Sequence, residues 1–199
     1  MGRSDSIVYL PYVTKSQSII FRQNPLSEQT NFYQNIYAYD NKEYDRNYPF
    51  AAKEYDKSNM GLVMKQGSSG LMYQLNSHPK EYEYGFNGPW GEVKKYSVTE
   101  SGTLNYKGSY PEKSLTTKIT KQPVTDFEKS ILIEYYDANE NLIAREQHIS
   151  MQDRRITYYI YDDLGHLRYV LPPSANIQAT TSPDQLPEDC FYYEYDEYN

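Results

Sequence analysis

The sequence is poor in cysteine and has no long apolar run. Cys190 is the only cysteine among 199 residues, so the chain can form no internal disulfide. This fits the cytosol, and it fits a large surface protein whose β-framework needs no cross-links. No stretch approaches the roughly 20 apolar residues that a transmembrane helix needs. No signal peptide is visible, although in a segment of a longer chain that absence says nothing about export.

The large apolar residues Leu, Ile, Val and Phe are also scarce. Leu, Ile, Val and Phe account for 38 of the 199 residues, and the formal net charge is -7. This is close to the composition at which disorder is expected. Disordered chains, however, are poor in aromatic residues, whereas this one contains 24 tyrosines. A tyrosine ring can be buried while its hydroxyl reaches a polar partner, and tyrosine favours strands, so the composition predicts a folded β protein.

Positive charge is not concentrated anywhere in the chain. The isoelectric point is ≈ 5.0, and the basic pairs Lys94-Lys95 and Arg154-Arg155 are interpreted as solvated surface charges. Because nucleic-acid binding needs a basic face, nucleic acid is excluded as an expected partner.

Apolar and polar residues alternate with a period of two through most of the chain. Residues 80–86 alternate tyrosine with glutamate, and 131–137 place Ile131, Ile133 and Tyr135 on one face. Turn signals separate these runs at 87–89, 101–102, 107–108 and 137–141. The pattern predicts an all-β fold of antiparallel hairpins that form an extended, curved sheet with few or no helices.

Two segments leave room for helix. Residues 126–147 contain good helix formers, but the alternation before DANEN favours a hairpin. At 182–189, Ser182 and Pro183 suit the cap and the first position of one helical turn. Residues 12–35 are polar and are expected to form a long connection.

A short phrase containing Tyr-Asp recurs. The dipeptide occurs six times, and three copies extend beyond it, beginning at Glu134, Tyr158 and Tyr192. In the first two the Tyr-to-Leu spacing is identical, from Tyr136 to Leu142 and from Tyr161 to Leu167. Three aligned units indicate an internal repeat. The other Tyr-Asp dipeptides are interpreted as chance in a tyrosine-rich chain.

Each unit is predicted to be a β-hairpin. In the second, Tyr159 and Tyr161 leave the first strand on the same face, Asp162 begins the turn, and Leu167 returns in the second strand. Gly165 supplies a position with positive φ.

The other two copies depart from this pattern. In the first, Asp137 begins the turn and Glu140 occupies the glycine position, so its neighbours Asn139 and Asn141 are expected to become left-handed instead. The last copy, with Tyr195 and Asp196, has a first strand and turn but no returning strand. More hairpins are therefore expected to follow in the intact protein.

A hairpin cannot bury its face alone, so the units are expected to stack side by side with an open edge through which chains self-associate. Three parts are predicted: residues 1–35 as a polar connecting segment with an N-terminal strand, 36–125 as a tyrosine-rich β-meander, and 126–199 as Tyr-Asp hairpin repeats, the last one truncated.

The tract YYIYDDLGHLRYVLPP resembles the YD-repeat, or Rhs, family, and is similar to Rhs repeat-associated proteins of Bacteroidetes. The segments YLPYV, YPFAAKEYDKSNMGLVMKQGSSG, YEYGFN and SYPEKSL resemble stretches that precede the repeats there, so the resemblance covers nearly the whole chain. It implies a very large bacterial surface or secreted protein whose repeats form a hollow β-sheet shell, often around a C-terminal toxin.

On that resemblance, the expected function is a non-catalytic structural segment without cofactors or membrane insertion. Its expected partners are the remaining repeats and a toxin cargo or surface glycan. The alternative is a carbohydrate-binding or adhesive module that uses exposed tyrosines and Trp90, the only tryptophan. The competing interpretation of Trp90 is that it packs against the fold.

Other candidate sites are weaker. The three histidines lack metal-ligand spacing, and Cys190 has no local histidine and is interpreted as a buried thiol at a strand edge. The acid pairs Glu81/Glu83 and Glu194/Asp196 could serve a glycosidase. An acidic β protein produces such pairs by chance, so a hydrolase is the least favoured of the three functions.

Overall fold

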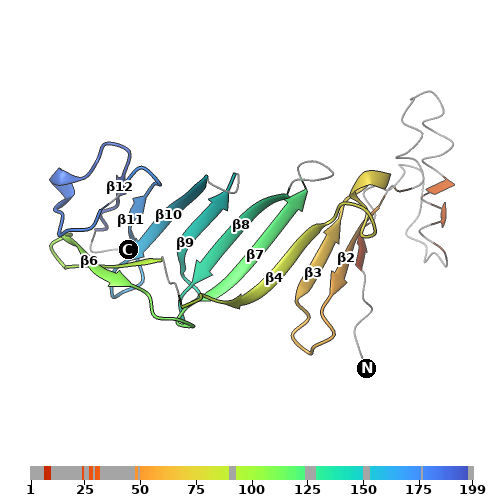
Figure 1. The fold of residues 1–199 in the computed structure, drawn as a ribbon, viewed down its shortest axis with the longest axis horizontal. Coiled ribbons are helices and arrows are strands. Elements are labelled where there is room, and N and C mark those ends of the chain that lie inside the picture. Colours follow the sequence, from red (N-terminus) through yellow and green to blue (C-terminus); the bar gives the residue numbers. More distant parts are fainter. Residues whose placement is uncertain are drawn as a thin grey trace. The chain divides into compact units, whose positions relative to one another are not determined.

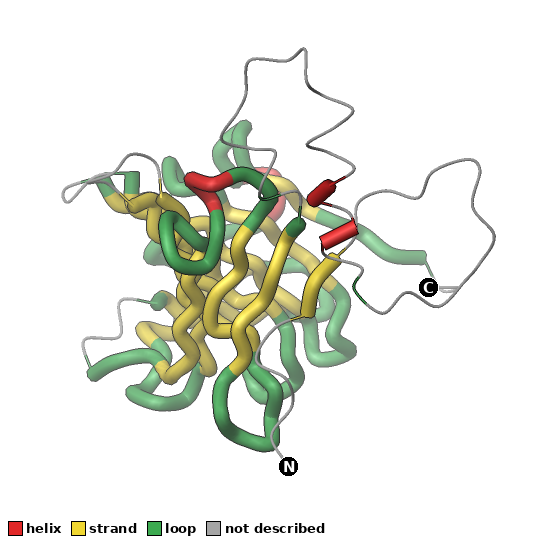
Figure 2. The backbone as a smooth tube through the Cα atoms, turned by 90° about the vertical axis from the view of Figure 1, so that its right-hand side faces the viewer, coloured by secondary structure: helices red, strands yellow, loops and turns green. Residues whose placement is uncertain are grey.

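A computed structural model describes residues 7–9, 24, 27–28, 30–31, 48, 50–89, 93–123, 129–149, 153–175 and 177–196. Within them the chain is almost entirely β, with antiparallel strands (Figure 1). Described residues 27, 28, 30 and 31 are helical, and two 3-10 turns, η1 (Leu71–Tyr73) and η2 (Pro183–Gln185), are the other helical elements described (Figure 2). The predicted fold class is therefore confirmed.

The described strands form one open sheet and one separate hairpin. They are β1 (Ile7–Tyr9), β2 (Ala51–Tyr55), β3 (Val63–Gly67), β4 (Lys80–Phe86), β5 (Lys94–Val98), β6 (Leu104–Ser109), β7 (Thr116–Pro123), β8 (Lys129–Tyr136), β9 (Leu142–His148), β10 (Arg154–Tyr161), β11 (Leu167–Leu171) and β12 (Phe191–Tyr192). The ten-stranded sheet has the order β1-β2-β3-β4-β7-β8-β9-β10-β11-β12, and β5 pairs with β6. Sequence neighbours are thus mostly sheet neighbours.

The chain divides into two compact units. The first comprises residues 1–82 and 121–129, and the second comprises 83–120 and 130–199. The three-part division at residues 35 and 125 stays a prediction. Most of the predicted connection at 12–35 lies outside the described residues.

The core of the second unit lies between strands β8–β11 and the β5–β6 hairpin. Leu104 of β6 and Tyr169 and Leu171 of β11 are fully buried in it. Leu104 also exchanges two backbone hydrogen bonds with Thr181, at 3.0 and 2.9 Å. The hairpin is thereby held against a segment far along the chain, and one face of the sheet becomes a core.

Of the two segments in which helix was considered, the first forms paired strands and the second forms a short helical turn. Residues 129–148 form the β8–β9 hairpin, as predicted. After Ser182, η2 begins at Pro183, and the Gln185 side chain accepts the Ser182 N–H at 3.3 Å. Both predictions are confirmed.

The turn predicted at 107–108 is wrong, because both residues lie inside β6. Lys94 pairs with Ser109 and Tyr96 with Tyr106, so β6 carries one extra residue there. Gly108 has φ 89°. Glycine supplies this conformation in one common type of β-bulge, so Gly108 marks a bulge inside a strand and not a turn between strands.

Candidate functional site

The two complete Tyr-Asp units close their turns with the same hydrogen bonds. The Asp137 N–H donates to the Asn141 carbonyl at 3.1 Å, and its Oδ1 accepts the Asn141 N–H at 2.9 Å. The Asp162 N–H donates to the His166 carbonyl at 2.9 Å, and its Oδ1 accepts the His166 N–H at 2.9 Å. Each aspartate therefore closes its turn with both its backbone and its carboxylate.

The residue before the closing position is left-handed in both turns. Gly165 has φ 85°, as its sequence position predicts, and Glu140 has φ 64°. The expectation that Asn139 or Asn141 would become left-handed is wrong. The hydrogen bonds that Asp137 makes to Asn141 fix the place of the left-handed residue, and a glutamate has to adopt the conformation there.

Replacing Glu140 with glycine is expected to raise the free energy of unfolding by about 0.5 kcal/mol, because relief of the left-handed strain outweighs the added chain entropy. The Gly165→Ala variant is expected to lose about 1 kcal/mol, although a Cβ there would meet nothing within 4 Å. Gly88→Ala is the control, since its Cβ also meets nothing within 4 Å and its φ is not positive. Urea unfolding of the three variants checks this, and equal effects at Gly88 and Gly165 would contradict it.

The structure contains a third Tyr-Asp hairpin, between β2 and β3. The Asp56 N–H donates to the Leu62 carbonyl at 2.8 Å, and Asp56 Oδ1 accepts the Leu62 N–H at 2.9 Å. Gly61, just before the closing residue, has φ 64°. Interpreting this dipeptide as chance was wrong, because its aspartate closes a turn in the same way as in the other units. Tyr55 pairs with Val63, so this turn is two residues longer than theirs. The signal that could have found it is the glycine next to the closing residue.

All three hairpins also share a bulge beside the tyrosine. The strand register shifts just before Tyr55, Tyr136 and Tyr161. In each case the returning strand has one extra residue, and these residues are Met64, Ile143 and Arg168. Turn closure and bulge together form one recurrent structural unit.

Two repeat tyrosines connect successive hairpins. The Tyr161 hydroxyl donates to the Leu142 carbonyl at 3.3 Å, and the Tyr195 hydroxyl donates to the Leu167 carbonyl at 2.9 Å. Each bond joins the tyrosine of one unit to the leucine that starts the returning strand of the preceding unit. Tyr159 precedes Tyr161 by two residues in β10.

The last copy is less regular than the sequence predicts. Its strand β12 covers Phe191–Tyr192 only, and Tyr195 and Asp196 lie beyond it. The Tyr193 N–H still donates to the Arg168 carbonyl at 2.9 Å. The ring of Tyr195 stacks on His166 with centroids 4.9 Å apart, so side-chain contacts continue where strand pairing has ended.

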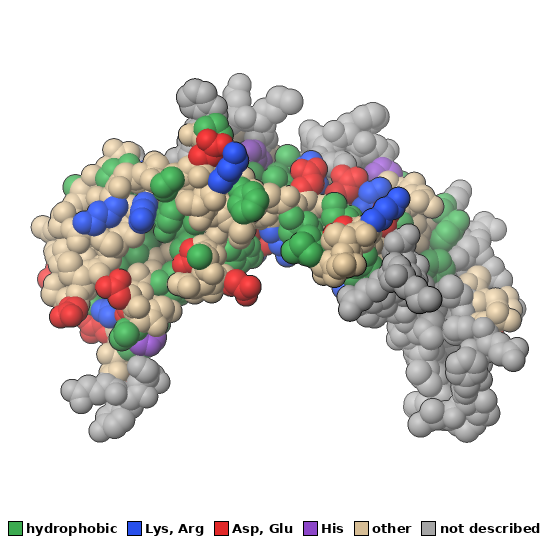
Figure 3. Space-filling view, turned by 90° about the horizontal axis from the view of Figure 1, so that it is seen from below, with side chains coloured by type: hydrophobic (Ala, Val, Ile, Leu, Met, Phe, Trp, Pro, Cys, Tyr) green, Lys and Arg blue, Asp and Glu red, His purple; other side chains and the backbone are tan. Residues whose placement is uncertain are grey.

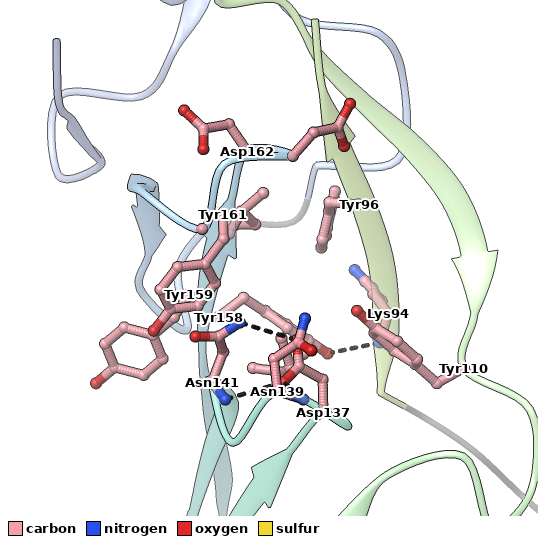
Figure 4. Close-up of a pocket in the computed structure, with 14 residues that line it drawn as sticks. Lys94, Tyr96, Tyr110, Asp137, Asn139, Asn141, Tyr158, Tyr159, Tyr161 and Asp162 are labelled. Carbon is pink, nitrogen blue, oxygen red and sulfur yellow. Dashed lines mark hydrogen bonds between the residues drawn. The ribbon is translucent and has the colours of Figure 1, made fainter. Parts of the chain in front are cut away.

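A cleft of ≈ 280 Å³ lies beside the two complete turns, within the second unit (Figure 4). It is lined by Lys94 and Tyr96 of β5, by Tyr110, by residues 158–161 at the end of β10, and by residues of the turns at 137–141 and 162–165. The cleft thus combines aromatic rings with carboxylates, amides and one ammonium group.

Burial shifts several pKa values at the cleft. Burial, together with the neighbouring Tyr158, strongly raises the pKa of Tyr96, and burial and Asp137 raise the pKa of Tyr110. Burial lowers the pKa of Lys94. Burial alone would raise the pKa of Asp162, but hydrogen bonds from the His166 and Leu164 backbone N–H groups bring it below its ordinary value. The tyrosines are therefore neutral and Asp162 is ionised at neutral pH.

Sequence reasoning missed a buried charge cluster around Glu146, which is 1% exposed. Its carboxylate accepts hydrogen bonds from the Tyr135 hydroxyl at 2.9 Å and from Arg154 Nη2 at 3.0 Å, and it contacts His148 Nε2. Arg154 is exposed, as predicted, but it also pairs with this buried carboxylate, whereas Arg155 pairs with the surface residue Asp153. No local sequence pattern distinguishes the two arginines. The strand register decides which of them reaches Glu146.

The remaining candidates show little chemistry. Burial raises the pKa of the Cys190 thiol, which is partly exposed. Among the described residues, no group of three or more His, Cys, Asp or Glu side chains is placed to hold a metal ion, and no described helix is long and apolar enough to cross a membrane. Trp90 lies outside the described residues.

Residues 1–86 match the model of a family described as a domain of unknown function, DUF6443. Searches of curated proteins and of solved structures gave no match. The matched region includes strands β1 to β4 and the hairpin that carries Tyr55 and Asp56. The match assigns no activity, and it does not by itself identify the chain as a YD-repeat protein.

Proposed function

We propose that this chain is a non-catalytic structural segment of a large bacterial surface or secreted protein of the YD-repeat (Rhs) type, and that it contributes to a β-sheet shell or scaffold. The observation that carries the proposal is the pair of hydroxyl bonds from Tyr161 to Leu142 and from Tyr195 to Leu167. Two of the recurrent tyrosines thus join hairpins, and Asp56, Asp137 and Asp162 close turns. This is the use expected of repeat residues in a scaffold.

The sheet order supports the same proposal. Strands β7 to β12 are neighbours in the sheet in the order of the sequence, so each hairpin packs beside the previous one. Strand β12 ends that order, and its edge is where we propose that further repeats, or a second copy of the chain, would pair. A toxin cargo and a location at the cell surface or outside the cell follow from the family resemblance alone.

Nucleic acid and membrane insertion are not part of the proposal. On the face seen in Figure 3, acidic and basic side chains of the described residues are scattered among polar and apolar ones. Binding to a phosphate backbone requires a large basic patch, and none is visible among the described residues on that face.

Removing the hydroxyl from the joining tyrosines tests this function. Tyr161→Phe is expected to lower the free energy of unfolding by about 1 kcal/mol, and Tyr195→Phe, whose bond is more exposed, by about 0.5 kcal/mol. Tyr193→Phe is the control, because the Tyr193 hydroxyl makes no hydrogen bond among the described residues. Hydrogen exchange of the β9–β12 amides would locate the loss.

Each variant is expected to speed amide exchange where its tyrosine contacts the preceding hairpin. This place is around Leu142 for Tyr161→Phe and around Leu167 for Tyr195→Phe. If all three variants behaved alike, the hydroxyl bonds would not be what holds the units together. The scaffold proposal would then lose its main support.

A second function, carbohydrate binding or adhesion, is favoured by aromatic rings near the end of the sheet. Phe191 is 60% exposed, and Tyr193 and Tyr195 are each 39% exposed. Such rings offer faces on which a sugar can stack. In this second proposal Trp90 would serve in the same way.

A further inference from the structure

Tyr161 lines the cleft of the second unit, but the chemistry of the cleft extends well beyond the bond that this tyrosine makes to Leu142. We propose that the cleft binds a single neutral sugar ring of a glycan, held between tyrosine rings and hydrogen-bonded by Asn139 and Asp163. Its volume of ≈ 280 Å³ is near the lower end of ordinary ligand pockets, about 300 Å³, which suits one ring. The inference rests on the carbohydrate-binding function proposed above and gives it a site.

Two buried tyrosines form a rigid wall of the cleft. Tyr96 and Tyr158 are 8% and 5% exposed, and their rings meet edge to face with centroids 5.6 Å apart. The Tyr96 hydroxyl donates to the Ile177 carbonyl at 2.9 Å, and the Tyr158 hydroxyl accepts the Lys94 N–H at 3.4 Å. Because both rings are fixed before a ligand arrives, binding costs little side-chain entropy at this wall.

The charges around the cleft disfavour an anionic ligand and suit a ligand with many hydroxyl groups. Asp137 lies at one end and Asp162 at the other, with the side chain of Lys94 between them (Figure 4). With Asp163, three carboxylates stand against the one ammonium of Lys94, so the lining disfavours an anion. Hydroxyl groups donate to carboxylates and accept from an ammonium, so a polyhydroxylated neutral molecule meets both requirements.

The turn aspartates are already engaged, so other groups are available for the sugar. Asp137 and Asp162 each accept two backbone N–H groups of their own turns. The side-chain amide of Asn139 and the carboxylate of Asp163 are exposed and make no hydrogen bond among the described residues. They can donate to and accept from sugar hydroxyls without breaking a turn.

Titration of the complete 199-residue chain by nitrogen-15 NMR tests the inference. The probes are glucose, galactose, mannose and N-acetylglucosamine. At least one is expected to give saturable shifts concentrated at residues 94–96, 137–141 and 158–163. Asn139→Ala is expected to weaken that binding about fivefold, as for one lost hydrogen bond. Asn59→Ala is the matched control, because it is an exposed asparagine in a Tyr-Asp turn that does not line the cleft.

The outcomes separate the site from the function. Saturable shifts centred on Phe191 and Tyr193 would overturn the cleft and leave carbohydrate binding in place. Binding at the cleft that Asn139→Ala does not weaken would overturn the proposed contacts. If no sugar bound, or if only phosphate or choline bound, both the cleft and the carbohydrate function would be overturned. The scaffold proposal, which the Tyr161→Phe variant tests, would be unaffected.

Discussion

The Arg154→Ala variant is expected to lower the free energy of unfolding by about 3 kcal/mol, although the arginine side chain is itself 36% exposed. The cost comes from Glu146, whose side chain is 2% exposed and would keep only Tyr135 and His148 as partners. A buried carboxylate that loses its cationic partner costs far more than a surface pair gains. Chemical denaturation followed by circular dichroism measures the change.

The next residue in the chain provides the control. Arg155→Ala removes the same side chain from a surface pair with Asp153, in which the arginine is 57% exposed and the aspartate 42%. It is expected to change the free energy of unfolding by less than about 0.5 kcal/mol. Equal effects at Arg154 and Arg155 would show that Glu146 does not depend on its arginine.

The Leu104→Ala variant is expected to cost about 3 kcal/mol, because Leu104 is 0% exposed and its loss leaves a cavity between β6 and the sheet. The same change at Leu164, which is 82% exposed, is expected to be nearly neutral. Thermal unfolding by calorimetry compares the two variants. A small effect at Leu104 would mean that the β5–β6 hairpin is not held by this packing.

The Leu104→Ala variant is also expected to affect the cleft. Lys94 and Tyr96 belong to the hairpin that Leu104 helps to hold, and they line the cleft. If the hairpin loosens in Leu104→Ala, sugar binding at the cleft is expected to weaken as well. Leu164→Ala should leave binding unchanged.

The strands and the complete hairpins could be predicted from the sequence because their signals are local. A period of two along 129–136, a Tyr-Asp pair and a constant spacing to Leu142 and Leu167 depend only on residues near one another in the chain. Gly165 is of the same kind, since a turn of that length requires a left-handed residue at one place. Where the turn is longer, as after Tyr55, the fixed spacing failed although the hydrogen bonds are the same.

The composition and the local pattern thus determined by themselves an antiparallel, tyrosine-rich β protein built from Tyr-Asp hairpins. Only the tertiary structure decided which of two adjacent arginines meets a buried glutamate, that Gly108 forms a bulge and not a turn, and that Tyr161 reaches the previous hairpin. It also brought Leu104 to Thr181 and so placed β5 over the cleft. Such contacts depend on strand register and on burial between distant segments, and no pattern of neighbouring residues records them.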